Sequence, residues 1–138
     1  MGDLEQRNLA AAAKMYEIAG AGDWTTAATL ITPDFFVTEA TTVPFAGRYE
    51  GIEGYRRLFT TLTSVINVTG FDLHQMTAGG DWVVVLLDIV AQDERGAPLP
   101  IPLAESLRFR DGLCCEIKPY YFDPALVHRA VAAKKALA

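Results

Sequence analysis

In the first part of the chain, apolar residues recur with the period of an α-helix. Residues 4–19 are rich in alanine and contain no helix breaker, and Asp3 begins a capping-box pattern. Asp23 can cap a second, short helix over 24–31, which Pro33 would end because proline cannot continue a helix. The third helix has the clearest pattern, a single apolar stripe. The stripe consists of Tyr55, Leu58, Phe59, Leu62, Val65 and Ile66.

The second part of the chain changes to the two-residue alternation of β-strands. Turns that contain glycine separate the predicted strands into successive antiparallel hairpins. These strands cover residues 67–77, 82–92, 100–110 and 113–122. A short strand is predicted earlier, over 35–40, and the segment "ATTVPFAGRYEG" is predicted to be a loop because it has no period. Asp123 and Pro124 then begin a last helix, with proline at its favoured first position.

The order of these elements predicts the fold class. Helices that precede a long antiparallel meander indicate an α+β domain, with the helices packed on one face of the sheet. Long strands twist and coil, so the sheet should be concave, and helices that cover a concave face can leave a pocket. The 138 residues have the length of one domain, residues 1–138, and 51% of them are hydrophobic, which is enough for a core.

Charge and composition exclude several classes of function. The net charge of −5 disfavours nucleic acid and anionic membranes as partners. The chain has no apolar run of about 18 residues, and acids stand where a secretory signal would have basic residues, so we expect a soluble, cytoplasmic protein. Two histidines without paired spacing, two adjacent cysteines and no phosphate-binding or nucleophile-elbow motif predict neither a metal nor an organic cofactor.

Three predicted strands each place one carboxylate among apolar residues on the same face. Successive side chains of a strand face opposite sides, so Glu39, Glu105 and Asp88 share a face with hydrophobic neighbours. A carboxylate that is buried without a partner raises its pKa, and it can then move a proton or donate a hydrogen bond at neutral pH. The same-face neighbours are Phe35 and Val37 for Glu39, Leu103, Leu107 and Phe109 for Glu105, and Val84, Leu86 and Val90 for Asp88.

These polar residues could also have purely structural roles. Arg48, Arg56 or Arg57 could pair with a carboxylate, and a β-bulge could turn any of the three carboxylates to the opposite face. His74, in the strand over 67–77, could act as a base or a ligand, but a lone histidine is more often an ordinary surface residue.

Four segments together resemble a known superfamily. In chain order they are "MYEIAGAGDWTTAATLITPDFFVTEA", "GRYEGIEGYRRLF", "GGDWVVV" and "ESLRFRDGLCCEIKPYYFDP". They cover nearly the whole chain and resemble the nuclear transport factor 2-like superfamily, in particular its ketosteroid-isomerase and SnoaL-like polyketide-cyclase branch. The resemblance implies a cone-shaped fold, in which a curved antiparallel sheet and its helices surround a deep apolar pocket. It also implies a homodimer.

The resemblance further implies roles for individual residues. In the isomerases a carboxylate on the first strand moves a proton, while a protonated carboxyl group on a later strand and a tyrosine stabilise the oxyanion. Glu39 matches the position of the base and Glu105 that of the protonated acid, with glutamate where the isomerases have aspartate. Tyr16 lies one position from the first-helix tyrosine, a rotation of about 100°. Tyr55 and Tyr121 are therefore alternatives for its role.

We expect a small-molecule enzyme that moves a proton on an apolar carbonyl compound, by isomerisation, aldol-type cyclisation or dehydration. Glu39 would be the base, and Glu105, kept neutral by Leu103 and Leu107, would donate a hydrogen bond to the enolate oxygen. One alternative is a non-catalytic ligand-binding or association domain, in which arginines pair with the carboxylates or side chains fill the cone. A second alternative is hydrolysis of an epoxide or ester by activated water, with Asp88 as the second polar partner.

Overall fold

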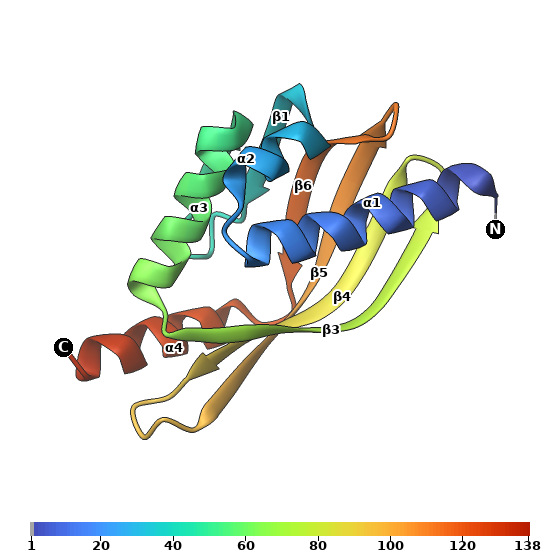
Figure 1. Cartoon of the computed structure of the whole chain (residues 1–138). Coiled ribbons are helices and arrows are strands. Elements are labelled where there is room, and N and C mark those ends of the chain that lie inside the picture. Colours follow the sequence, from blue (N-terminus) through green and yellow to red (C-terminus); the bar gives the residue numbers. More distant parts are fainter. Residues whose placement is uncertain (1) are drawn as a thin grey trace.

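A strongly curved sheet carries α1, α2 and α3 on its concave side, and α4 lies across one end (Figure 1). This computed structural model describes residues 2–138, within which no helix is long and apolar enough to span a membrane. The helices are α1 (Asp3–Gly20), α2 (Trp24–Ala27), α3 (Gly51–Val65) and α4 (Pro124–Ala136), with a 3₁₀ turn at Ala28–Leu30. The strands are β1 (Ile31–Glu39), β2 (Gly47–Glu50), β3 (Val68–Gly79), β4 (Trp82–Gln92), β5 (Pro98–Arg110) and β6 (Leu113–Tyr121).

The strands form one six-stranded sheet in the order β2-β1-β6-β5-β4-β3. From β3 to β6 each strand is antiparallel to the next, which confirms the predicted meander and the α+β class. However, β1 runs parallel to β6, so the sheet is mixed and not wholly antiparallel as predicted. No hairpin joins these two strands, and a long crossover allows the parallel direction.

A tight turn between β5 and β6 sets the register of these two strands around Glu105. Asp111 and Gly112 both have positive φ angles, 54° and 81°, as in the type I′ turn that suits a two-residue hairpin. A bulge at Cys115 then shifts the pairing by one residue. As a result, Glu105 lies opposite Pro119 and Leu103 lies opposite Tyr121.

Three local predictions are wrong in detail. Gly2, not Asp3, is the N-cap of α1, and a glutamate side chain in the first turn accepts a hydrogen bond from its amide. Pro33 lies inside β1 and does not end the second helix, because β1 begins at Ile31 and its pairing with β6 is irregular around the proline. The predicted loop contains β2, whose four residues bury only Tyr49 and are too few to show an alternation.

Helix α3 packs closely on β1 and β2 and confirms the predicted apolar stripe as far as Val65, while Ile66 follows the helix in an extended conformation. A Cβ atom at Gly54 would lie 2.6 Å from the carbonyl carbon of Tyr49, so only glycine allows this approach. The next residue, Tyr55, is 8% exposed and contacts a group of aromatic rings. Its ring centroid lies 5.2 Å from that of Phe35, 5.4 Å from that of Trp24 and 5.5 Å from that of Phe59.

Candidate active site

Strands β1 and β5 turn their carboxylates toward the concave side of the sheet. Glu39, the last residue of β1, is 6% exposed, and Phe35 and Val37 on the same face are buried. Glu105, in the middle of β5, is half-buried, and Leu103 on its face is buried. The predicted alternation is therefore confirmed for both glutamates.

Strand β6 lies between these two strands and brings the glutamates to the same level. Glu105 is directly opposite Pro119, and Val37 pairs with Ile117, so Glu39 continues that register toward Pro119 from the other side. Neighbouring strands are about 4.8 Å apart, so the two backbones are separated by only about 10 Å across β6. Long glutamate side chains can converge over that distance.

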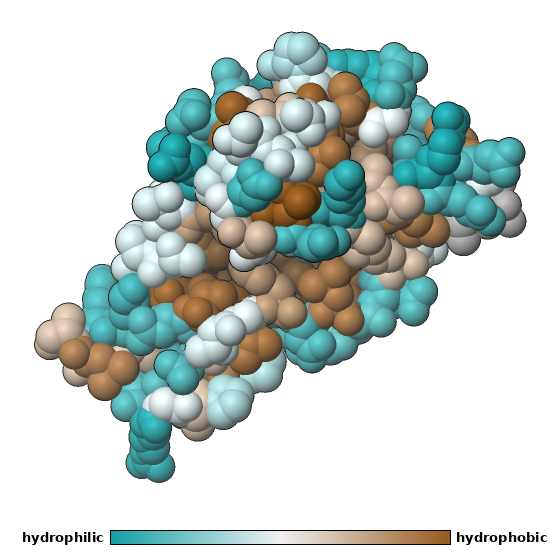
Figure 2. Space-filling model, in the orientation of Figure 1, coloured by the Kyte–Doolittle hydropathy of each residue, from teal (hydrophilic) through white to brown (hydrophobic). Residues whose placement is uncertain are grey.

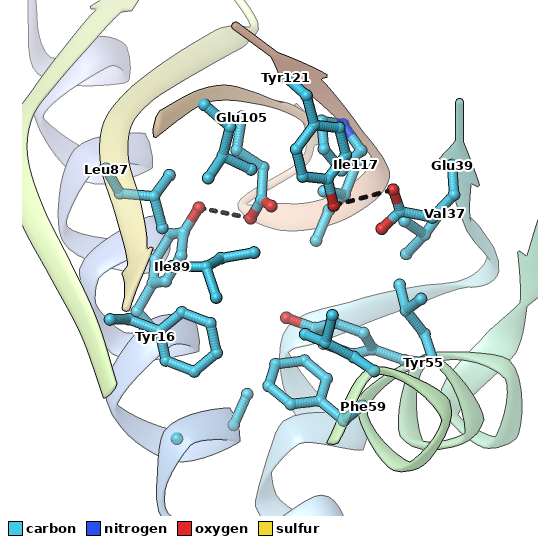
Figure 3. A pocket seen from close by; sticks show the side chains of 17 residues that line it. Tyr16, Val37, Glu39, Tyr55, Phe59, Leu87, Ile89, Glu105, Ile117 and Tyr121 are labelled. Carbon is cyan, nitrogen blue, oxygen red and sulfur yellow. Dashed lines mark hydrogen bonds between the residues drawn. The ribbon is translucent and has the colours of Figure 1, made fainter. Parts of the chain in front are cut away.

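Each carboxyl group accepts a hydrogen bond from a tyrosine (Figure 3). The Tyr16 hydroxyl, from α1, donates to Oε1 of Glu105 at 2.5 Å. The Tyr121 hydroxyl, from the end of β6, donates to Oε1 of Glu39 at 3.2 Å. Tyr16 thus reaches the site although it lies one residue away from the position of the first-helix tyrosine in the isomerases.

Burial among apolar side chains shifts the pKa values of Glu39 and Glu105 upward. Desolvation, followed by repulsion from Glu105, raises the pKa of Glu39 from 4.5 to about 8, against a lowering by the Tyr121 hydrogen bond. Desolvation also raises the pKa of Glu105, and the hydrogen bond from Tyr16 opposes that shift. The pKa values of Tyr16 and Tyr121 are raised, first by burial, so both hydroxyls keep their protons at neutral pH.

One cavity reaches both carboxyl groups. It offers about 60 Å³ to the centres of water molecules, room for several waters, and most of its lining is apolar. None of its lining residues in the described chain, residues 2–138, is an arginine, lysine or histidine. Besides the two glutamates and Tyr16, Tyr55 and Tyr121, the lining consists of Ala19, Gly20, Val37, Leu58, Phe59, Leu62, Phe71, Leu87, Ile89, Leu103, Ile117 and Pro119.

The cavity lies where the end of α1, the middle of α3 and strand β3 meet. Gly20, Leu62 and Phe71 line it from these three elements. The space-filling view shows apolar side chains around a hollow in this region, between the helices and β3 (Figure 2). A ligand could therefore enter from solvent along an apolar surface.

Two predicted site residues lie elsewhere. Leu107 is 1% exposed and belongs to the core, where it does not line the cavity. Asp88 lies on the outer face of β4, since the buried residues of that strand are its alternate neighbours, among them Leu87 and Ile89. Asp88 Oδ2 lies 3.1 Å from His74 Nε2. Asp88 is therefore not placed to hold a water molecule together with Glu39.

The inward residues of β3 and β4 were not predicted from the sequence. Phe71, Leu87 and Ile89 all line the cavity. In β4 the signal was present, because the face opposite Asp88 is entirely apolar. That face has no carboxylate, so a prediction based on carboxylates selected the wrong side of the strand.

One group of side chains on the outer face has the donor types of a metal site. The ligand atoms of Asp72, His74 and Asp88 lie within 4.8 Å of one another. Asp72 and His74 are exposed, and the contact of 3.1 Å between His74 Nε2 and the Asp88 carboxyl group already accounts for the position of His74. The cavity itself contains glutamate and tyrosine oxygens but no histidine or cysteine among its lining residues in 2–138.

Residues 12–117 match the family model of the SnoaL-like domain. The chain belongs to this family. The match confirms the resemblance inferred from the four sequence segments. Among curated proteins, none matches this SnoaL-like chain.

Solved structures share the fold of this SnoaL-like protein over most of its length. TerC, crystallised with polyporic acid, has a TM-score of 0.76 at 19% identity and covers 91% of this chain and 98% of its own. An NTF2-like protein from Burkholderia pseudomallei has a TM-score of 0.77 at 16% identity, covering 92% and 98%. A protein from Jannaschia sp. assigned as a SnoaL-like polyketide cyclase has a TM-score of 0.72 at 16% identity, covering 96% of each chain. These likenesses establish the curved α+β fold.

Proposed function

We propose that this SnoaL-like protein is an enzyme that moves a proton on an uncharged, apolar carbonyl compound. The observation that carries the proposal is a pair of carboxyl groups in one apolar cavity, both with raised pKa values and both bonded to tyrosines instead of cations. Strongly shifted pKa values in a cavity are typical of acid–base catalysis.

Glu39 is the proposed base. Its pKa of about 8 keeps both protonation states accessible near neutral pH, which suits a group that takes up and returns a proton. The carboxylate removes a proton from the carbon next to the carbonyl group. The C–H electron pair moves into the new C=C bond, and the carbonyl π electrons move to oxygen, which gives an enolate. Where a C=C bond adjoins the acidic carbon, the charge spreads along it, and the protonated Glu39 returns its proton to the far carbon, which completes an isomerisation.

Glu105 is the proposed stabiliser of the enolate. Burial favours its neutral form, and Tyr16 donates to only one of its oxygens. The O–H group formed by the other oxygen can then donate a hydrogen bond to the substrate oxygen as negative charge develops there. A hydrogen bond of this kind acts most strongly in a site without bulk water.

The cavity lining supports an uncharged ligand. An anionic group would be placed beside two carboxyl groups with no lysine, arginine or histidine in the described lining. The likeness to TerC, crystallised with polyporic acid, and to the Jannaschia protein assigned as a SnoaL-like polyketide cyclase supports a small-molecule ligand in this fold. No metal or organic cofactor is part of the proposed chemistry, and the homodimer implied by the resemblance stays a prediction.

The two alternatives are less well supported. The carboxylates lack arginine partners within residues 2–138, and the cone retains a cavity, both of which disfavour a filled, non-catalytic domain. Hydrolysis with Asp88 as the second polar group is disfavoured because Asp88 lies on the outer face with His74.

The test is exchange of the α-protons of β-tetralone, an apolar enolisable ketone, in deuterated buffer, followed by NMR. We expect Glu39→Gln to lower the enzymatic exchange rate by about 10²–10⁴-fold, the usual contribution of a general base. Asp88→Asn, on the outer face, should change the rate by less than about twofold. Full exchange by a folded Glu39→Gln variant would overturn the assignment.

The pH dependence of the same reaction gives a second check. Because the carboxylate form of Glu39 is the base, kcat/KM should rise about tenfold per pH unit below its pKa and level off near pH 8. A rate that falls as the pH rises from about 6 to about 8 would contradict this role.

A further inference from the structure

The outer face of the sheet, on the side away from the cavity, carries a cluster of metal-ligating side chains. The ligand atoms of Asp72 and His74 in β3 and of Asp88 in β4 lie within 4.8 Å of one another. A metal ion with bonds of about 2.0–2.2 Å holds its ligand atoms about 3–4 Å apart. The distance of 3.1 Å between His74 Nε2 and Asp88 Oδ2 is already in this range. A small rotation of the exposed Asp72 side chain therefore completes a site with three ligands.

A β-bulge in β3 places His74 beside the two aspartates. The pairing of β3 with β4 passes from Leu73 and Leu87 directly to Gln75 and Leu86, so His74 is an extra residue without a partner in β4. Bulges of this kind redirect a side chain, and this one leaves His74 on the face of Asp72 and Asp88. The backbones of two adjacent strands thus bring the three ligands together, which fixes them more firmly than loops would.

The contact between His74 and Asp88 does not account for Asp72. Asp72 and Asp88 are paired directly opposite each other, and like charges in this arrangement destabilise an antiparallel pair of strands. Within residues 2–138, neither carboxylate forms an ion pair with a lysine or an arginine. A divalent cation between the two strands offsets both negative charges and also uses the imidazole that the bulge supplies.

A groove on the outer face begins at two of these residues. His74 and Asp88 line it, together with Pro102, which is the partner of Asp88 in β5, and the exposed rings of Tyr120 and Phe122. Three protein ligands leave coordination positions open, as in metal sites that bind a further molecule. The groove is a separate indication of a ligand, because it provides room for one beside the three side chains.

We propose that Asp72, His74 and Asp88 form a binding site for a divalent transition-metal ion, with Zn²⁺ as the best match. One imidazole nitrogen and two carboxylate oxygens are ligands that Zn²⁺ accepts. Water or the polar group of a small molecule in the groove completes the coordination. The site lies on the opposite face of the sheet from Glu39 and Glu105, so it does not rest on the proposed function.

The test is titration of Zn²⁺ into the full chain by isothermal titration calorimetry. We expect the wild type to bind about one ion per chain in a saturable manner. His74→Gln and Asp72→Asn should each weaken binding at least about tenfold, because even the loss of a residue that only supports a metal ligand costs about 10–100-fold. Asp72→Asn is the decisive variant, since Asp72 takes no part in the contact between His74 and Asp88. The matched control is His128→Gln, which removes the other histidine of the chain and should keep the wild-type affinity.

A ¹⁵N NMR spectrum of the histidine rings shows where the ion binds. Zn²⁺ should shift the Nε2 signal of His74 and leave the signals of His128 unchanged, which also separates this site from binding at the two cysteines. The absence of saturable binding, or equal affinity in the wild type, Asp72→Asn and His74→Gln, would overturn the inference. Binding that is lost in His74→Gln but intact in Asp72→Asn would likewise overturn the site with three ligands. Glu39→Gln should bind Zn²⁺ as the wild type does, so this result is separate from the test of proton transfer.

Discussion

The two faces of the sheet carry carboxylates in similar sequence patterns but in different surroundings. Asp88, on the outer face, has a side chain that is 20% exposed and lies 3.1 Å from His74. Glu39, on the inner face, is 6% exposed, and within residues 2–138 its carboxyl group has only the Tyr121 hydroxyl as a hydrogen-bond partner. Asp88 thus has a polar neighbour and contact with solvent. For Glu39, burial raises the pKa and favours the neutral form.

This comparison shows why an isolated carboxylate on an apolar strand is an ambiguous signal. The outer face is itself rich in apolar side chains, with Leu86 at 46% exposure and Tyr120 at 57%. Asp88 therefore has apolar neighbours just as Glu105 does. What separates the two positions is the layer of helices, which covers only the inner face (Figure 1).

The largest effect should come from placing a new carboxylate on each face of β4. Leu87→Asp introduces a charge at a position that is 3% exposed, and we expect a loss of more than about 4 kcal/mol or no folded protein. Leu86→Asp, one residue away and facing outward, should cost less than about 1 kcal/mol. Urea unfolding measures both changes. A cost above about 2 kcal/mol for Leu86→Asp would mean that the outer face is covered in solution.

The next effect is a fall in stability with rising pH that comes from Glu39 on the inner face. The folded pKa of Glu39, about 8, is above its unfolded value of 4.5, so the folded state holds an extra proton between these limits. The contribution of Glu39 to the free energy of unfolding is then greatest below about pH 4.5. It falls by up to about 1.4 kcal/mol per pH unit until pH 8. Glu39→Gln, which is always neutral, should remove this slope.

Urea unfolding of the wild type and Glu39→Gln at several pH values checks this prediction. The variant should be more stable than the wild type at about pH 8, and the difference should shrink toward about pH 5. Parallel stability profiles for the two proteins would show that Glu39 is not held neutral by the fold.

A smaller effect concerns the helix that encloses the inner face. Gly54→Ala places a Cβ atom 2.6 Å from a backbone carbon of Tyr49, so α3 must shift outward. We expect a loss of about 1–3 kcal/mol, measured by thermal and urea unfolding, because overpacking strains a tight interface. Gly70→Ala in β3 is the matched control, because no atom of the described residues other than Gly70 and its chain neighbours lies within 4 Å of the added carbon. Equal stability changes in the two variants would contradict the close-packing role of Gly54.

The smallest effect should come from removing single hydroxyls on the two faces. Tyr16→Phe deletes the hydrogen bond to Glu105, which lowers the pKa of that carboxyl group, so the pKa should rise further in the variant. Stability should fall by about 0.5–1.5 kcal/mol. Carbon-detected NMR titration follows the Glu105 carboxyl group. A pKa that falls in Tyr16→Phe would contradict the observed pairing, and Tyr120→Phe on the outer face serves as the control.

Much of the secondary structure and the two glutamates of the site can be predicted from local sequence patterns. The period of the apolar residues is enough to predict α3 and the four-strand meander, and Asp123 with Pro124 is enough to predict the start of the last helix. Alternation along single strands is also enough to place Glu39 and Glu105 on apolar faces. The short strand β2 and the N-cap at Gly2 escaped prediction because four residues, or one, give too weak a pattern.

The amino-acid order alone could specify which side chains share a strand face, since that depends only on the backbone between neighbours. It could not specify which face becomes the interior, and so Asp88 was placed on the wrong side. That choice depends on where the helices pack, and it creates partners that are remote in sequence. Tyr16 and Glu105 are 89 residues apart and Tyr121 and Glu39 are 82 apart, so only the folded chain brings each hydroxyl to its acid. The shifted acidity of the glutamates arises from burial and from these contacts, both of which are properties of the tertiary structure.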